Sequence, residues 1–154
     1  MLGFQIYSSI SQFQKAQVIG DRYVIRNYPH TSLYGTPGRK EAYIVAPASN
    51  GFIPNEHGIA EIIVEAKHQS TSGSTDEKPP HVWEAFLVSP VPNWIVIFDG
   101  PYWKSTGRFE KGRGKLGVAW LQARAEARTP ENRRLVVIDR MGFIRLATET
   151  WGAQ

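Results

Sequence analysis

Short apolar runs separated by polar segments that contain proline and glycine follow one another along this chain, and they predict strands interspersed with helices. Runs of about four to eight apolar or alternating residues are typical of strands, whereas apolar residues spaced by three or four are typical of helices. The predicted strands are 21–29, 41–46, 59–69 and 93–100. The predicted helices are 8–20, a segment ending at 88 that Ser74 or Thr75 can cap, and 116–130.

The final apolar stretch, 133–147, is interpreted as a hairpin of two strands that turns at residues 139–142. The expected order of elements is therefore αβββαβαββ, which indicates a mixed central β-sheet flanked by helices, an α/β fold. A chain of 154 residues is a suitable length for one domain, 1–154, and no internal repeat or low-complexity tract divides it.

Composition narrows the class of protein only slightly. Apolar residues make up 42% and charged residues 21%, and no apolar run reaches the roughly 18 residues that a membrane-spanning helix needs. The absence of cysteine excludes disulfides and thiolate metal sites, and the beginning of the chain does not resemble a signal peptide. We therefore expect a cytoplasmic protein, of cellular or phage origin, and its net charge of +4 is compatible with a nucleic-acid partner.

The strand predicted at 59–69 begins with apolar residues but ends in polar ones. Because side chains of a strand alternate between its two faces, Glu65, Lys67 and Gln69 follow Ile63 on one face. A carboxylate and an amine about 7 Å apart along a strand most commonly form a surface ion pair. They are also the groups that metal-assisted phosphodiester hydrolysis requires, since Mg²⁺ prefers carboxylate oxygens and a lysine can assist the attacking water or offset charge on phosphate.

Such a hydrolytic site requires a second carboxylate close to Glu65. Glu61, on the same strand, is about 13 Å away in an extended chain and is too distant to share an ion. If this strand pairs with the preceding one as a hairpin around residue 53, Glu41 falls opposite Glu65, where Cβ atoms lie roughly 5 Å apart. Glu56, in the loop between the two strands, is the alternative second carboxylate.

Three segments, GRKEAYIVAP, IAEIIVEAKHQ and SGSTDEKPPHVWEAF, together resemble the PD-(D/E)XK nuclease superfamily. This superfamily includes restriction endonucleases, homing endonucleases, Holliday-junction resolvases and phage nucleases. The resemblance is clearest across residues 39–100 and includes the apolar strand WIVIFDG. It implies a restriction-endonuclease-like core, a mixed sheet flanked by helices, which agrees with the order of elements predicted above.

The resemblance also implies roles for individual residues. Glu65 matches the second acid of the motif, Lys67 the catalytic lysine and Glu41 the first acid. Aspartate is the usual residue at the first-acid position, so Glu41 departs from the pattern. Gln69 matches a polar position from which an amide can hydrogen-bond a DNA phosphate or a metal-bound water. The implied catalytic residues are Glu41, Glu65, Lys67 and Gln69, with Glu41 and Glu65 as ligands of Mg²⁺, for which Mn²⁺ is expected to substitute.

Basic residues outside this strand are candidates for binding DNA. The segment 104–115, KSTGRFEKGRGK, carries five basic residues and one glutamate, and its glycines let the backbone approach a phosphate closely. Such a segment is ordinarily a solvated loop, but a nuclease site nearby favours contact with DNA. The residues expected to contact DNA are Arg39, Lys78, Lys104, Arg108, Lys111, Arg113 and Lys115.

The tryptophans and histidines are interpreted as structural. Trp83, Trp94 and Trp120 lie in apolar stretches and are expected in the core. Trp103 is assigned to the core or to a dimer contact, with stacking on a base or ribose as the alternative. The four histidines have no zinc-binding spacing, and His68 is expected to be packed or paired on the face of its strand opposite to Glu65.

Together these observations indicate a small Mg²⁺-dependent DNA endonuclease that leaves 5′-phosphate and 3′-hydroxyl ends, with sequence-specific cleavage of the restriction or homing type. Because one chain offers one site, cutting both strands of double-stranded DNA is expected to need a homodimer, a higher homo-oligomer or two binding events. One alternative is a structure-selective nuclease that cuts branched DNA. A second is a non-catalytic nucleic-acid-binding domain with a degraded site, which the glutamate at position 41 favours. A third is a carbohydrate- or protein-binding α/β domain with a chance Glu-x-Lys pattern.

Overall fold

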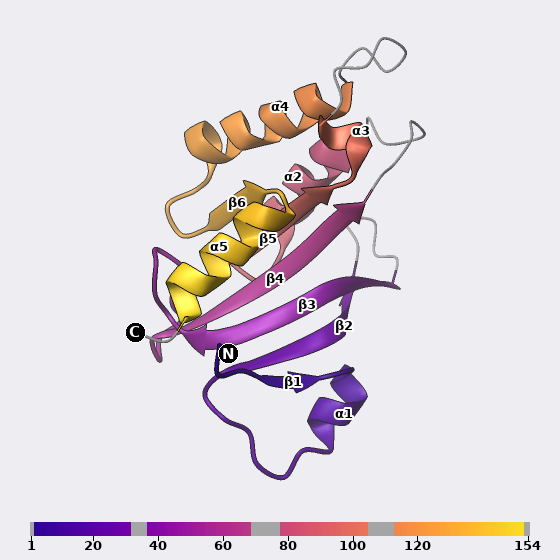
Figure 1. The fold of residues 1–154 in the computed structure, drawn as a ribbon. Coiled ribbons are helices and arrows are strands. Elements are labelled where there is room, and N and C mark those ends of the chain that lie inside the picture. The colour runs from indigo at the N-terminus through magenta and orange to yellow at the C-terminus, as the bar shows by residue number, and fades with distance from the viewer. Residues whose placement is uncertain (1, 32–36, 69–77, 105–112, 153–154) are drawn as a thin grey trace.

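A computed structural model describes residues 2–31, 37–68, 78–104 and 113–152, and a six-stranded sheet forms its centre (Figure 1). The strands lie side by side in chain order. They are β1 (Gln5–Tyr7), β2 (Tyr23–Thr31), β3 (Pro37–Pro47), β4 (Ile59–His68), β5 (Asn93–Asp99) and β6 (Arg134–Ile138). The helices are α1 (Ile10–Gln14), α2 (Lys78–Val88), α3 (Pro101–Lys104), α4 (Arg113–Arg128) and α5 (Arg140–Trp151).

The sheet is mixed, as the sequence predicts. β2, β3 and β4 pair in antiparallel fashion, whereas β4, β5 and β6 are parallel, and β1 runs parallel to β2. Parallel neighbours need crossover connections, which α2 supplies between β4 and β5 and which α3 and α4 supply between β5 and β6. The carboxyl ends of β4, β5 and β6 therefore meet at one edge of the sheet, where ligands of open α/β sheets commonly bind.

Helices cover both faces of the sheet and give two apolar layers (Figure 1). On the face covered by α2 and α4, Trp83, Phe86 and Leu121 pack against Trp94 and Val96. We call this the α2–α4 face, and α1 packs on it near β1 and β2. On the opposite face, the α5 face, apolar residues of α5 pack against the central strands. The predicted fold class, an α/β fold with a mixed sheet flanked by helices, is confirmed.

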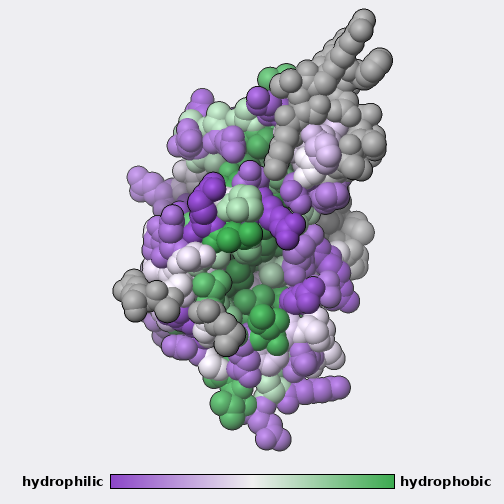
Figure 2. Space-filling model, in the orientation of Figure 1, coloured by the Kyte–Doolittle hydropathy of each residue, from purple (hydrophilic) through white to green (hydrophobic). Residues whose placement is uncertain are grey.

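The α5 face is only partly covered by its helix. Figure 2 shows apolar residues at the bottom of a hollow that polar residues surround. The hollow is a cavity of about 630 Å³ between β1, the central strands and α5, and its lining is almost wholly apolar, with Phe4, Ile44 and Trp151 among its residues. Glu41 also lines it, which places one predicted metal ligand beside an apolar cavity.

The C-terminal region differs from the predicted hairpin, which is wrong. β6 ends at Ile138, and the carboxylate of Asp139 accepts a hydrogen bond from the backbone N–H of Gly142 at 2.7 Å, which caps the first turn of α5. The segment 139–142 resembles a turn in sequence because Asp and Gly favour both turns and helix starts. The apolar residues that follow repeat with the spacing of a helix and are Phe143, Leu146, Ala147 and Trp151.

Because the side chain of Asp139 caps the first turn of α5, Asp139→Ala is expected to lower the free energy of unfolding by about 1 kcal/mol. Urea denaturation followed by far-UV circular dichroism measures this difference. Glu149→Ala, an exposed position on the same helix, is the control and is expected to change stability by less than about 0.5 kcal/mol. An equal loss of stability in both variants would contradict the capping role.

Smaller differences concern the N-terminal and basic regions. The helix predicted at 8–20 is limited to α1, because the following Val18 and Ile19 are exposed and give it no apolar face to bury. β1 was not predicted, and α4 begins at Arg113, within the predicted basic loop. Among the described helices, none combines the length and the apolar character needed to cross a membrane.

The tryptophans follow the prediction with one exception. Trp83, Trp94 and Trp103 are buried, whereas Trp120 is 38% exposed and the prediction that it belongs to the core is wrong. Trp120 lies on the outer side of α4, where the guanidinium of Arg124 stacks over its ring at 4.9 Å. The apolar stretch around Trp120 thus reflects an amphipathic helix with one aromatic residue on its solvent side.

Candidate active site

The candidate site lies at the carboxyl end of β4, where a strand that starts in the core brings a carboxylate and an amine to the surface. Glu65 is only 6% exposed, and the ammonium group of Lys67 contacts its Oε1 atom. The side chain of Lys67 is 25% exposed, so its amine lies between the buried carboxylate and solvent. The alternation of the strand therefore places Glu65 and Lys67 on one face, the α2–α4 face, as the sequence predicts.

Lys40, on β3, approaches the other oxygen of the same carboxylate. Its Nζ lies 3.1 Å from Oε2 of Glu65 and 5.0 Å from the centre of the Trp94 ring. Lys40 is not among the residues predicted for the site, although it lies next to the predicted first acid. The structure thus adds a second lysine to the pair that the sequence predicts.

Two lysines determine the charge of Glu65. Burial alone would raise the pKa of this carboxyl group, but the ammonium groups of Lys67 and Lys40 outweigh burial and hold the pKa below its ordinary value. Glu65 is therefore an ionised, buried carboxylate at neutral pH. A buried charge of this kind is tolerated when it is paired, and it is a common feature of functional sites.

The strand register agrees with the prediction, but the position of the Glu41 side chain does not. β3 pairs with β4 through Ala42 and Val64, the register in which the sequence places Glu41 opposite Glu65. The Glu41 carboxylate nevertheless accepts a hydrogen bond from the backbone N–H of Ala66 at 2.8 Å, and Glu41 lines the cavity on the α5 face. The backbone of Glu41 thus lies opposite Glu65 in the strand register, but its side chain, including the carboxylate, lies on the α5 face of the sheet.

An interruption in the strand alternation accounts for this difference. Lys40 and Tyr43 both lie on the α2–α4 face, although an odd number of positions separates them, so the alternation is broken between them. Asn27 of β2 lies opposite Glu41 and has a backbone φ of 49°, in the left-handed region that Asn tolerates better than most residues. The break turns Lys40 toward Glu65 and turns Glu41 away from it.

The two other glutamates considered for the site lie elsewhere. Glu56 is in the loop before β4, with its side chain 84% exposed and paired with His57, and β4 separates it from Glu65 by about 20 Å. Glu61 accepts a hydrogen bond from the hydroxyl of Tyr43. Burial, and secondly this hydrogen bond, raise the pKa of Tyr43 well above its ordinary value. Neither carboxylate can share an ion with Glu65.

The remaining predicted residues are distributed around the edge of the sheet. Arg39 is exposed on β3, Lys78 begins α2, and Lys115 is exposed in the first turns of α4. Lys104 and Arg113 lie in α3 and α4, but their side chains are outside the described part of the structure. Gln69, Arg108 and Lys111 lie outside the described residues altogether. His68 is exposed and lies 3.6 Å from the carboxylate of Asp99 on β5, so it is paired, as predicted, rather than packed.

The donor atoms at Glu65 fit a hard cation that keeps much of its water. Oε2 of Glu65 is buried and is in ion-pair contact with the Lys40 ammonium at 3.1 Å, and among the described residues it has no hydrogen-bond partner. Within the described ranges no group of three histidine or acidic side chains could enclose a metal ion. A site of one or two carboxylates suits Mg²⁺ or Mn²⁺, which is commonly held by few protein ligands together with water and substrate phosphate oxygens.

Comparison with known proteins identifies the family of the chain. A family model described as the PD-(D/E)XK nuclease superfamily domain matches residues 4–151, nearly the whole chain and both strands of the candidate site. No curated protein and no solved structure gives a match. The chain therefore belongs to the PD-(D/E)XK nuclease superfamily, whose members are hydrolases of nucleic acid that generally use divalent metal ions.

Proposed function

We propose that this protein is a metal-dependent DNA endonuclease that hydrolyses phosphodiester bonds at the carboxyl end of β4. The observation that carries the proposal is the buried, ionised carboxylate of Glu65 with the Lys67 ammonium against one of its oxygens. A carboxylate can hold a hard cation, and an ammonium group can stabilise a phosphate, so the pair offers both requirements of the reaction. The expected products carry 5′-phosphate and 3′-hydroxyl ends, as the family chemistry implies.

Lys67 and Lys40 have different roles in this proposal. Lys67 is partly exposed, and its amine can turn from Glu65 to the scissile phosphate, where it offsets the negative charge that builds up as the attacking oxygen adds. Lys40 is 15% exposed and is held over the Trp94 ring. It keeps Glu65 ionised when Lys67 moves to the substrate.

Glu65 and Glu41 would hold the metal ion, with water and phosphate oxygens completing its ligands. A bound Mg²⁺ or Mn²⁺ would supply a Lewis acid at the phosphate and a more acidic water molecule. Glu65 already lies on the correct face, whereas Glu41 would have to release the Ala66 amide and turn around the edge of β3. Glu65 would therefore be the principal ligand of the metal ion and Glu41 an auxiliary one.

A non-catalytic nucleic-acid-binding domain is the second candidate function. It is favoured by the position of Glu41, whose carboxylate accepts a hydrogen bond from the Ala66 amide and does not lie beside Glu65. Such a domain would bind DNA through its basic residues but would not cut it. If the protein does cut both strands of a duplex, one site in each chain implies that two copies act together, as in a homodimer.

Incubation of the purified protein with supercoiled plasmid and with a branched oligonucleotide junction, in Mg²⁺, Mn²⁺ or EDTA, tests the proposal. The wild type is expected to cut with either metal and not with EDTA. Lys67→Ala is expected to reduce the cleavage rate at least about a hundredfold, because transition-state charge loses a donor worth roughly 3 kcal/mol. Lys15→Ala, at an exposed lysine after α1, is the control and should cut like the wild type.

The products distinguish the alternatives. Discrete plasmid fragments indicate a sequence-specific enzyme, whereas cleavage of the junction without plasmid fragments indicates a structure-selective one. Salt-sensitive DNA binding without cleavage in either metal would favour the non-catalytic domain and contradict the hydrolytic role of Glu65 and Lys67.

A further inference from the structure

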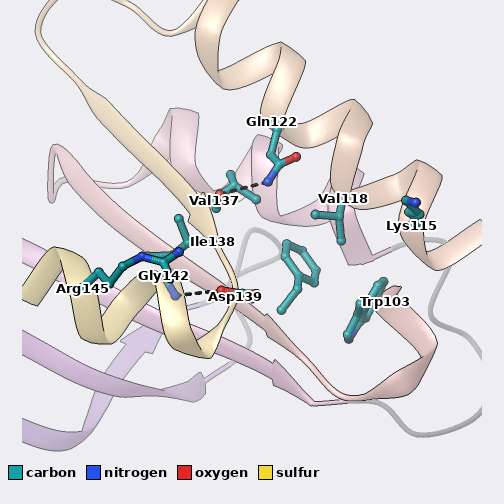
Figure 3. Close-up of a pocket in the computed structure, with 10 residues that line it drawn as sticks. Trp103, Lys115, Val118, Gln122, Val137, Ile138, Asp139, Gly142 and Arg145 are labelled. Carbon is teal, nitrogen blue, oxygen red and sulfur yellow. Dashed lines mark hydrogen bonds between the residues drawn. The ribbon is translucent and has the colours of Figure 1, made fainter. Parts of the chain in front are cut away.

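A second cavity lies at the carboxyl ends of β5 and β6, and the candidate site does not use it. Its volume is about 520 Å³, within the range of small-molecule binding sites. Figure 3 shows Lys115 on α4 and Arg145 on α5 on opposite sides of this cavity, with Trp103 near its floor. We call it the α4–α5 pocket.

The α4–α5 pocket adjoins the candidate active site. Phe98, which lines the pocket, is the register partner of Lys67, and neighbouring strands lie about 4.8 Å apart. Phe98 also belongs to the apolar layer of the α2–α4 face, the face on which Glu65 and Lys67 lie. A nucleic-acid strand with one phosphate at Lys67 would therefore bring its next nucleotide within reach of the pocket.

The walls of the pocket combine aromatic rings with aliphatic surface. Phe98 and Trp103 pack edge to face, with ring centroids 4.7 Å apart, and Val118 adds apolar surface. Trp103 is 3% exposed, and its Nε1 has no hydrogen-bond partner among the described residues. Because both rings are almost completely buried, a ligand in the pocket can contact only the small part of each ring that reaches the pocket surface.

The charges of the pocket favour a ligand that carries a phosphate. Lys115 and Arg145 contribute two positive charges from separate helices, and both side chains are exposed. Asp139 contributes one negative charge, but its carboxylate also caps α5 at the Gly142 amide. Aromatic surface, two cations and polar groups of both kinds are the features that bind an unstacked nucleotide.

We propose that the α4–α5 pocket binds the nucleotide next to the scissile phosphate, with Lys115 and Arg145 contacting its phosphate and the Phe98–Trp103 wall contacting its base. This inference rests on the proposed function of Glu65 and Lys67. A base can enter the pocket only after it leaves its stack, which costs least in single-stranded or branched nucleic acid. The pocket therefore favours such substrates over an undistorted duplex.

Binding is tested separately from cleavage, by fluorescence anisotropy of a fluorescein-labelled single-stranded oligonucleotide in EDTA. Lys115→Glu and Arg145→Glu are each expected to weaken binding about tenfold and to reduce the slope of log K against log salt by about 1. Val118→Trp fills the pocket without changing its charge, and it is expected to weaken binding about tenfold with an unchanged slope. Arg128→Glu, on α4 about 20 Å from Lys115, is the matched control and should change binding less than about twofold.

Two outcomes would overturn the inference. If Arg128→Glu weakens binding as much as the pocket variants, the attraction comes from the charge of the whole surface. If Val118→Trp is folded and binds as tightly as the wild type, no nucleotide enters the pocket. Circular dichroism establishes folding, and the two exposed charge variants decide the test against Arg128→Glu if Val118→Trp does not fold.

Measuring cleavage by the wild type in Mg²⁺ as well separates this inference from the proposed function. If the wild type cuts, and the pocket variants bind and cut as the wild type does, the pocket proposal is rejected and the hydrolytic role stands. Weakened binding by the pocket variants, in a wild type that does not cut, supports the pocket and rejects the hydrolytic role.

Discussion

Glu65→Gln is expected to reduce the rate of plasmid cleavage at saturating Mg²⁺ by at least about a thousandfold, which corresponds to about 4 kcal/mol of transition-state stabilisation. Glutamine keeps the size of the side chain but removes the charge that two lysines hold in place and that a cation requires. A metal ion commonly contributes several kcal/mol of charge stabilisation to such reactions. DNA binding in EDTA should be nearly unchanged, because the variant removes a negative charge and no basic residue.

Glu41→Gln distinguishes the role of the Glu41 carboxylate from that of Glu65. Because Glu41 lies on the other side of the sheet and is engaged by the Ala66 amide, this variant is expected to need more Mg²⁺ and to recover much of its activity when Mg²⁺ is raised. Glu65→Gln should not recover in this way. Glu56→Gln, in the distant loop, is the matched control and should cut like the wild type.

Two results would contradict this ranking of the acids. If Glu41→Gln is as inactive as Glu65→Gln at every Mg²⁺ concentration, both carboxylates bind the ion with equal importance, and Glu41 must move across the strand edge. If Glu65→Gln cuts at the wild-type rate, the pair at the end of β4 is only a structural ion pair. Thermal unfolding of each variant distinguishes lost chemistry from lost folding.

Asn93→Ala is expected to lower the free energy of unfolding by roughly 2–4 kcal/mol, a large effect for one polar residue. Asn93 is fully buried at the start of β5. Its side-chain oxygen accepts from the Ile53 N–H at 2.7 Å, and its amide donates to the carbonyls of Ile53 at 3.0 Å and Glu61 at 2.9 Å. Alanine would leave all three backbone groups without these partners in a site with little access to water.

The expected fall in Tm is roughly 5–10 °C for a chain of this length, and a thermal melt followed by circular dichroism measures it. Asn132→Ala is the matched control, because Asn132 is exposed in the turn before β6 and its backbone does not adopt the left-handed conformation. It should lower Tm by less than about 2 °C. Similar losses in both variants would show that the buried network around Asn93 contributes little, and that β4 and β5 are aligned by their backbone pairing alone.

Local patterns in the sequence were sufficient for the central part of the fold and for placing Glu65 and Lys67 on one face of their strand. Period-two alternation along residues 59–69 places Glu65 and Lys67 on one face, because adjacent strand residues must point in opposite directions. The length of the loop before this strand predicts the register of β3 with β4, since antiparallel neighbours pair symmetrically about their connection. These features depend only on residues close together in the chain.

The sequence predicted that Glu41 of β3 lies beside Glu65, whereas the structure brings Lys40 to Glu65 instead. That depends on Asn27 of β2, whose left-handed backbone lies opposite Glu41 and coincides with a break in the alternation. No pattern within β3 reveals the break, because Lys40 and Glu41 are adjacent polar residues and either could face the site. The choice between a hairpin and α5 was of the same kind, since Asp139 and Gly142 are equally suited to a turn and to a helix start. The helix is selected because its apolar residues pack against the central strands.

For this protein the sequence by itself determined the α/β class, the family resemblance and the acidic and basic residues at the carboxyl end of β4, because strand alternation and short-range pairing express them locally. Only the tertiary structure decided that Lys40 rather than Glu41 contacts Glu65, and that Lys115, Trp103 and Arg145 share one pocket. Contacts of this kind join residues that are distant along the chain. Their geometry follows from how strands and helices pack, which no local sequence pattern encodes.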